Sequence, residues 1–169
     1  TKVLDLGTGS GAIALAIASA SPLASLIATD QSLEALTIAR QNAKLLHLTN
    51  QVEFFQGSWY EAISPQSQFE LILSNPPYIA SQDPHLTQGD LRFEPRSALT
   101  DFGDGLSCLE RIILGATSYL KPGGLLALEH GFDQSGAVAQ LMQAAGLVDI
   151  QAYPDLAGHL RVSSGRNRL

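Results

Sequence analysis

The sequence predicts an α/β fold in which a mostly parallel sheet carries helices on both of its faces. Short apolar runs alternate with helix-like stretches along the chain, as they do where helices connect parallel strands. The apolar runs are nearly continuous, which is typical of strands buried on both faces. The length of 169 residues suits one domain, and we expect that domain to span residues 1–169.

The sequence of the first half of the chain indicates four strands and two helices. The first strand leads through a run of glycines into an alanine-rich stretch that favours a helix. The second helix is indicated by apolar residues at helical spacing, from Leu33 through Leu36 to Ala39 and Ala43. The predicted strands cover residues 3–6, 26–29, 52–55 and 69–73, and the predicted helices cover residues 12–20 and 33–46.

The sequence of the second half of the chain indicates three more strands, which makes seven in all. A helix over residues 106–119 precedes a turn at Pro122-Gly123-Gly124, and the fifth strand follows over residues 125–129. After another helix over residues 135–145, two β-type runs remain. These runs, at residues 149–153 and 161–164, are expected to pair as a C-terminal antiparallel hairpin at the edge of the sheet.

Composition narrows the class of protein. Apolar residues make up 45% of the chain and charged residues 15%, a balance that excludes a disordered chain and a coiled coil. Apolar runs fall well short of the roughly 20 residues of a membrane-spanning helix, so we expect a cytoplasmic protein with no membrane partner. Cys108 is the only cysteine and the four histidines are scattered, so no metal site is expected.

A glycine-rich turn follows the first predicted strand. Its sequence is Gly7-Thr8-Gly9-Ser10-Gly11, and three glycines allow the backbone both to turn tightly and to approach a ligand closely. Ligands of open α/β sheets bind at the carboxyl ends of the strands. The turn therefore predicts a nucleotide-type pocket.

Asp30 ends the second predicted strand, where a carboxylate can accept hydrogen bonds from both hydroxyls of a ribose. This position implies a ligand that contains adenosine. Gly7, Gly9 and Ala12 also fit the dinucleotide-binding pattern, so the turn and Asp30 by themselves leave a nicotinamide cofactor open.

The tetrapeptide Asn75-Pro76-Pro77-Tyr78 follows the fourth predicted strand. Two prolines fix φ and remove two donors, so the carbonyl oxygens are held at a set angle. The Asn75 side-chain oxygen and the Pro76 carbonyl could together accept both hydrogens of a planar amino group, with Tyr78 packed flat against it. A hydride-transfer enzyme has no use for this arrangement, and the tetrapeptide therefore favours a methyl donor over a dinucleotide.

These motifs together resemble the class I S-adenosylmethionine-dependent methyltransferases, and more narrowly the HemK/PrmC group of release factor glutamine methyltransferases. The resemblance covers nearly the whole chain. Besides the glycine turn and the tetrapeptide, it rests on Gln82-Asp83-Pro84-His85-Leu86, Arg92-Phe93-Glu94-Pro95-Arg96-Ser97-Ala98-Leu99, Leu128-Glu129-His130-Gly131 and Asp155-Leu156-Ala157-Gly158-His159.

The resemblance implies a Rossmann-like fold and the transfer of a methyl group from S-adenosylmethionine, with S-adenosylhomocysteine as the product. The acceptor would be the side-chain amide nitrogen of the glutamine in the Gly-Gly-Gln motif of class I peptide chain release factors. By similarity, residues 7–11 and Asp30 bind the cofactor, Trp59 packs near the adenine, and Asn75 contacts both cofactor and substrate. The stretch from Asn75 to Tyr78, including Pro76 and Pro77, would bind the glutamine amide and form the catalytic site.

Two other functions remain open at this stage. An adenine-N6 nucleic-acid methyltransferase shares the Asn75-Pro76-Pro77-Tyr78 motif, but the net charge of −6 disfavours a nucleic acid partner. A non-catalytic S-adenosylmethionine-binding module would have no need of the intact tetrapeptide. The resemblance also implies a small N-terminal helical domain for substrate binding, so we expect these residues to be the methyltransferase domain of a longer protein, with a monomer favoured.

The segment of residues 79–105 is the longest stretch without a predicted element. It is polar and contains Pro84 and Pro95, and a loop of that length inside a compact domain is usually functional. We expect it to cover the site. Arg92 and Arg96 in this segment either meet an acidic partner surface or face solvent.

Overall fold

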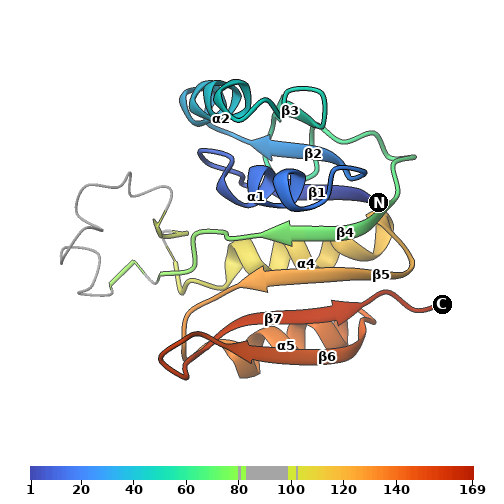
Figure 1. The fold of residues 1–169 in the computed structure, drawn as a ribbon. Coiled ribbons are helices and arrows are strands. Elements are labelled where there is room, and N and C mark those ends of the chain that lie inside the picture. The colour runs from blue at the N-terminus through green and yellow to red at the C-terminus, as the bar shows by residue number, and fades with distance from the viewer. Residues whose placement is uncertain (80, 83–98, 102) are drawn as a thin grey trace.

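The computed structural model describes residues 1–79, 81–82, 99–101 and 103–169. Figure 1 shows strands and helices alternating along most of the chain, as predicted. None of the helices in these ranges is long and apolar enough to cross a membrane. The elements are β1 (Lys2–Leu6), α1 (Ala12–Ala20), β2 (Ser25–Asp30), α2 (Leu33–Leu45), β3 (Val52–Gln56), β4 (Phe69–Ser74), α4 (Ser107–Tyr119), β5 (Leu120–Glu129), α5 (Ser135–Ala144), β6 (Val148–Pro154) and β7 (Leu160–Arg166).

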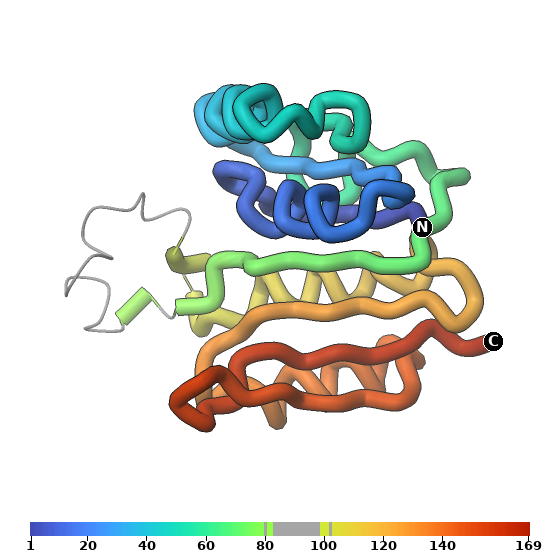
Figure 2. Tube along the Cα trace, in the orientation of Figure 1, coloured from blue at the N-terminus to red at the C-terminus, as the bar shows by residue number. Residues whose placement is uncertain are grey.

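The seven strands form one sheet in the order β3-β2-β1-β4-β5-β7-β6. The first five strands pair in parallel, and β7 pairs antiparallel with both β5 and β6. The predicted C-terminal hairpin is confirmed, with β6 at the edge and β7 inside the sheet. Figure 2 shows both ends of the chain on the same side of the molecule, where the parallel strands begin and opposite their carboxyl ends.

Helices cover both faces of the sheet, as predicted. Successive side chains of a strand point to opposite faces, and β1 shows the result: Val3 packs in one buried cluster with residues of α1, whereas Leu4 and Leu6 pack in another with residues of α4 and α5. Figure 1 shows α1 in front of the sheet and α4 and α5 behind it. The helices lie on two faces because the connections are right-handed crossovers that run in opposite directions along the sheet. The connection from β1 to β2 places α1 on one face, and the connection from β4 to β5 places α4 on the other.

The start of β5 differs from the prediction. The sequence predicts a turn at Pro122-Gly123-Gly124 and a strand from Leu125, but β5 begins at Leu120. Phe69 pairs with Leu120 and Leu71 with Leu125, so the three residues lie in a bulge of β5. Gly123 has φ of 74°, and its N–H donates to the carbonyl of Asn167. The bulge keeps the strand continuous because its backbone bonds to the C-terminal residues.

Most of the predicted loop over residues 79–105 lies outside the described residues, including Arg92 and Arg96. At the described ends of the segment, the Ile79 N–H donates to the Leu99 carbonyl at 2.9 Å, and the Ser81 N–H donates to the Gly103 carbonyl at 2.9 Å. The residues just after the tetrapeptide therefore lie beside those that lead into α4. That the segment covers a site stays a prediction.

Gly115 and Gly136 give a matched test of the packing of α4. A Cβ at Gly115 would overlap the ring of Tyr60, whose hydroxyl donates to the Ile112 carbonyl. We expect Gly115→Ala to lower the free energy of unfolding by about 1–3 kcal/mol despite the better helix propensity of alanine. Gly136 in α5 has no atom within 4 Å of its Cβ position, and Gly136→Ala should be neutral or stabilising by up to about 1 kcal/mol. Urea unfolding measures both, and equal effects would contradict this packing.

Candidate active site

The glycine turn and the tetrapeptide lie next to each other because β1 and β4 are neighbours. Leu6 at the end of β1 pairs with Ser74 at the end of β4. The buried Ser74 hydroxyl also donates to the Leu6 carbonyl at 2.6 Å. The turn starts at Gly7 and the tetrapeptide at Asn75, so both emerge from the same edge of the sheet, at the point where the strand order reverses. Open α/β sheets bind their ligands at such a point.

All three glycines of the turn have positive φ, at 68° for Gly7, 57° for Gly9 and 85° for Gly11. Side chains other than glycine rarely adopt this conformation. A Cβ at Gly11 would lie 3.3 Å from the Ala39 Cβ of α2, so this glycine also allows α2 to pack closely. At Gly9 a Cβ would meet nothing within 4 Å. The backbone at Gly9 therefore borders open space, as a ligand-binding turn requires.

Asp5 is a buried carboxylate beneath the turn. Its Oδ2 accepts hydrogen bonds from the Thr8 hydroxyl at 2.6 Å and from the Ala14 N–H at 3.2 Å, so it joins β1, the turn and α1. Among the described residues its Oδ1 has no hydrogen-bond partner. Burial raises the pKa of Asp5 to about 6, although the hydrogen bonds from Thr8 and Ala14 lower it. The sequence gives no sign of this shift, because it depends on burial in the folded chain.

Asp30 ends β2 beside the turn, at the predicted place. One carboxylate oxygen accepts from the Gly9 N–H at 2.8 Å, and the other accepts from the Ser32 N–H at 2.8 Å. Each carboxylate oxygen has two lone pairs, so both can still accept a further hydrogen bond. Asp30 holds the turn against the start of α2, where Ser32 caps the helix by accepting from the Ala35 N–H. Its predicted role towards a ribose stays a prediction.

Trp59 lies against the start of the glycine turn. Its ring is 3.4 Å from the position that a Cβ of Gly7 would occupy. Trp59 has φ of 51°, and its carbonyl accepts a hydrogen bond from the Thr29 hydroxyl at 3.1 Å. The Thr29 carbonyl in turn accepts from the Thr8 N–H at 2.9 Å. The end of β2 therefore links Trp59 to the turn, and the aromatic ring packs beside Gly7.

In the tetrapeptide, Asn75 is exposed, Pro76 is buried and Tyr78 is half-buried. The Tyr78 hydroxyl donates to Oε1 of Glu129 at the end of β5, at 2.9 Å. Its carbonyl accepts from the Gln134 side chain, also at 2.9 Å. Sequence reasoning missed both contacts. The motif Leu128-Glu129-His130-Gly131 marked Glu129 as notable, but the pattern around Gln134 gave no signal.

His130 follows Glu129 but makes separate contacts. It is fully buried, and its Nε2 lies 2.8 Å from the Ser163 hydroxyl of β7, while its Nδ1 lies 2.8 Å from the Gly131 carbonyl. The His130 N–H also donates to the Arg161 carbonyl. These bonds tie the end of β5 to β7, so this histidine has a structural role.

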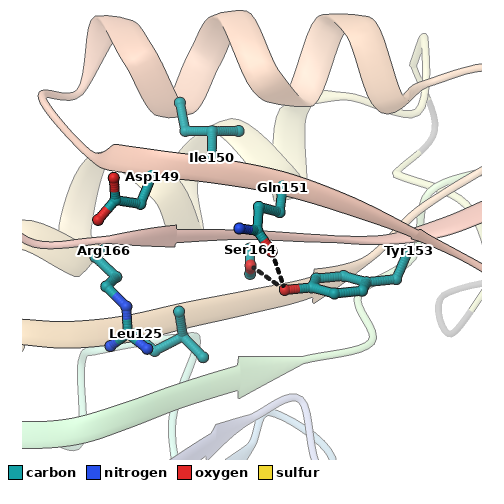
Figure 3. A pocket seen from close by; sticks show the side chains of 7 residues that line it. All are labelled: Leu125, Asp149, Ile150, Gln151, Tyr153, Ser164 and Arg166. Carbon is teal, nitrogen blue, oxygen red and sulfur yellow. Dashed lines mark hydrogen bonds between the residues drawn. The ribbon is translucent and has the colours of Figure 1, made fainter.

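A hollow of about 290 Å³ lies elsewhere, on the edge hairpin of β6 and β7 (Figure 3). Several of its polar side chains already have partners: the Tyr153 hydroxyl donates to Gln151 at 2.8 Å, and the Arg166 side chain donates to the Gly123 carbonyl. None of the predicted site residues lines this hollow. It is therefore separate from the candidate site.

Comparison with known proteins identifies the class. The fold is shared with solved methyltransferase structures, including one from Pyrococcus furiosus with a TM-score of 0.72, 19% identity and coverage of 99% of this chain and 75% of that one. An O-methyltransferase family protein from Burkholderia thailandensis has a TM-score of 0.69, 17% identity and coverage of 99% and 51%. The predicted class I methyltransferase fold is thereby confirmed.

The sequence places the chain in a family. The model of the methyltransferase small domain family matches residues 1–94, which include the glycine turn, Asp30, Trp59 and the tetrapeptide. The chain belongs to this family.

Curated relatives match nearly the whole chain. A protein named release factor glutamine methyltransferase from Xylella fastidiosa is 56% identical over 165 residues, which cover 98% of this chain and 59% of that protein. One of the same name from Burkholderia pseudomallei is 51% identical over 168 residues, with coverage of 97% and 59%. This chain therefore spans about three-fifths of the length of these relatives.

The raised pKa of Asp5 predicts how stability depends on pH. Because the folded-state pKa of about 6 exceeds the ordinary 3.8, the stability that Asp5 gains by holding a proton is complete below about pH 4 and is lost as pH rises through 6. An asparagine side chain stays neutral at every pH, so the unfolding free energy of Asp5→Asn should rise relative to the wild type by about 2 kcal/mol from pH 4 to pH 7. Urea unfolding at both pH values measures this difference. The exposed Asp133→Asn serves as the control for an aspartate-to-asparagine exchange, and an Asp5→Asn profile parallel to the wild type would contradict the assignment.

Proposed function

We propose that this chain binds S-adenosylmethionine and transfers its methyl group to the side-chain amide nitrogen of a glutamine. We propose further that this glutamine lies in the Gly-Gly-Gln motif of class I peptide chain release factors. The observation that carries the proposal is the adjacency of the glycine turn after β1 and Asn75-Pro76-Pro77-Tyr78 after β4. The names of the curated relatives support the choice of substrate.

The residues around the glycine turn fit the cofactor. Gly9 borders open space, and the buried Oδ1 of Asp5 has no partner among the described residues, so it can accept from a donor such as an ammonium group. Asp30 keeps lone pairs for the two ribose hydroxyls, and the Trp59 ring offers an apolar surface for the adenine. Positive glycine φ angles let Gly7 to Gly11 line the methionine and ribose portions.

The tetrapeptide fits a primary amide. The Asn75 side-chain oxygen and the Pro76 carbonyl accept the two amide hydrogens, which fixes the plane of the group and directs the nitrogen towards the glycine turn. Asn75 thus contacts both the acceptor and the cofactor, while Pro77 keeps the backbone rigid and removes a competing donor. The Tyr78 ring packs against the amide plane. Catalysis on this view comes chiefly from positioning.

Bound S-adenosylmethionine supplies the electrophile: the amide nitrogen forms a bond to the methyl carbon while the carbon–sulfur bond breaks, its electron pair stays on sulfur to give S-adenosylhomocysteine, and the nitrogen releases a proton to water. The chain's own residues hold the amide and the cofactor in place. Because the proton leaves after transfer, the arrangement needs no strong base next to the nitrogen.

A protein partner is favoured over a nucleic acid. The net charge of −6 repels a phosphate backbone, whereas a protein loop that carries a glutamine needs no basic groove. We propose that residues 1–169 form the methyltransferase domain, that the chain acts in the cytoplasm, and that it works as a monomer. The function of an adenine-N6 methyltransferase and that of a binding-only module are the alternatives that the experiments below separate.

The substrate can be identified by mass spectrometry. A purified class I release factor and adenine-containing DNA are each incubated with this chain and S-adenosylmethionine. We expect one added methyl group on the Gly-Gly-Gln peptide and none on the DNA. Methylated adenine would replace the proposed substrate, and unmodified release factor despite bound cofactor would contradict the proposed activity of this chain.

Asn75 separates catalysis from cofactor binding. Asn75→Ala removes one of the two acceptors for the amide, and we expect the methyl-transfer rate to fall at least about 10²-fold because the nitrogen is no longer held in line with the methyl group. Calorimetric titration should show that S-adenosylhomocysteine still binds, with a dissociation constant raised by no more than about tenfold, because the glycine turn, Asp30 and Trp59 remain in place. Asn50→Ala, at an exposed loop position, is the matched control and should match the wild type in both assays. Unchanged transfer in Asn75→Ala would support the binding-only module.

A further inference from the structure

Tyr78 is held at both of its ends by residues that lie far away in the sequence. Its hydroxyl, at the tip of the ring, donates to Glu129 Oε1 at 2.9 Å. Its backbone carbonyl accepts from Gln134 Nε2 at 2.9 Å. One contact fixes where the ring points and the other fixes where the backbone of the tetrapeptide ends.

Gln134 joins three segments through its single side chain. Its Nε2 faces the carbonyls of Tyr78 and Gly105, at 2.9 and 3.4 Å, and its Oε1 accepts from the Gly131 N–H at 2.8 Å. A Cβ at Gly105 would overlap the Tyr78 carbonyl oxygen, so the residues leading into α4 also pack directly on the tetrapeptide. These partners determine the orientation of the Gln134 amide, because carbonyl acceptors face its nitrogen and an N–H donor faces its oxygen.

The groups that hold Tyr78 are themselves fixed by the sheet. Glu129 is the last residue of β5 and pairs with Val162 of β7. The next residue, His130, is bonded to β7 through its backbone N–H and its ring. Glu129 therefore projects from a rigid strand end, which gives it more precision than a loop residue would have.

We propose that Glu129 and Gln134 are positioning residues, which hold the ring and the backbone of Tyr78 so that the tetrapeptide grips the acceptor amide in the reactive orientation. This inference rests on the proposed methyl transfer to a glutamine amide. Glu129 acts here as a hydrogen-bond acceptor for the tyrosine and takes no proton from the substrate. A shift of the amide by about 1 Å can cost two orders of magnitude in rate. The bond from Gln134 to the Tyr78 carbonyl, which fixes the backbone, therefore matters as much as the bond from the Tyr78 hydroxyl to Glu129, which fixes the ring.

Three substitutions separate hydrogen bonding from charge and bulk. Glu129→Gln keeps an oxygen that accepts from the Tyr78 hydroxyl, whereas Glu129→Leu fills similar space without an acceptor. Gln134→Glu places a carboxylate oxygen against the carbonyls of Tyr78 and Gly105, which removes both donated bonds and adds repulsion. Glu53→Leu, at an exposed position of β3, is the matched control for a glutamate-to-leucine change in a strand.

Steady-state methyl transfer to a Gly-Gly-Gln peptide is measured for each variant, together with the dissociation constants for S-adenosylhomocysteine and for the peptide in its presence. We expect Glu129→Leu and Gln134→Glu to lower kcat about 10- to 100-fold and to weaken peptide binding about tenfold, with cofactor binding within about twofold of the wild type. Glu129→Gln should retain kcat within about threefold, and Glu53→Leu should match the wild type.

The outcomes distinguish this inference from the function on which it rests. An active wild type with unchanged kcat and peptide binding in Glu129→Leu and Gln134→Glu would overturn the positioning role alone. Equal losses in Glu129→Gln and Glu129→Leu would also overturn it, because the charge and not the bond to Tyr78 would then matter. A wild type that binds S-adenosylhomocysteine but neither binds nor methylates the peptide would overturn the proposed function and the inference together.

Discussion

The parallel pairing of β1 with β4 is the constraint on which the candidate site depends. Leu6 pairs with Ser74, and the bond from the Ser74 hydroxyl to the Leu6 carbonyl locks this register at the point where both strands end. A slip by one residue would turn the strand side chains to the wrong faces and would displace the tetrapeptide from the glycine turn. Since the strand order reverses here, helices leave the space above the pair free for a ligand.

Buried or half-buried carboxylates then fix the loops at the carboxyl ends of the strands by accepting hydrogen bonds from them. Asp5 holds the glycine turn from below and Asp30 holds it from the side, while Glu129 holds Tyr78. The burial of Asp5 costs stability, as its raised pKa indicates. The hydrogen bonds that Asp5 accepts preorganise the turn, so binding a ligand requires little further ordering of the backbone.

Local patterns were enough to predict the strands, the helices, the C-terminal hairpin and the position of both motifs, because each depends on periodicity or on glycine and proline. The contacts of Tyr78 could not be predicted in this way. Glu129 and Gln134 lie 51 and 56 residues away from it, and only the packing of β5 and α5 brings them there. The predicted start of β5 was wrong for a related reason: Gly123 and Gly124 bond to Asn167 near the C-terminus, so Pro122-Gly123-Gly124 become a bulge within the strand.

We propose that a glutamine amide is held against a methyl donor at the carboxyl ends of β1 and β4. A crystal structure of this chain with S-adenosylhomocysteine and a Gly-Gly-Gln peptide tests this most directly. We predict the glutamine amide nitrogen within hydrogen-bond distance of the Asn75 side-chain oxygen and the Pro76 carbonyl, with the cofactor sulfur facing that nitrogen across the glycine turn. A peptide bound elsewhere, or a cofactor that does not contact residues 7–11, would contradict the proposal.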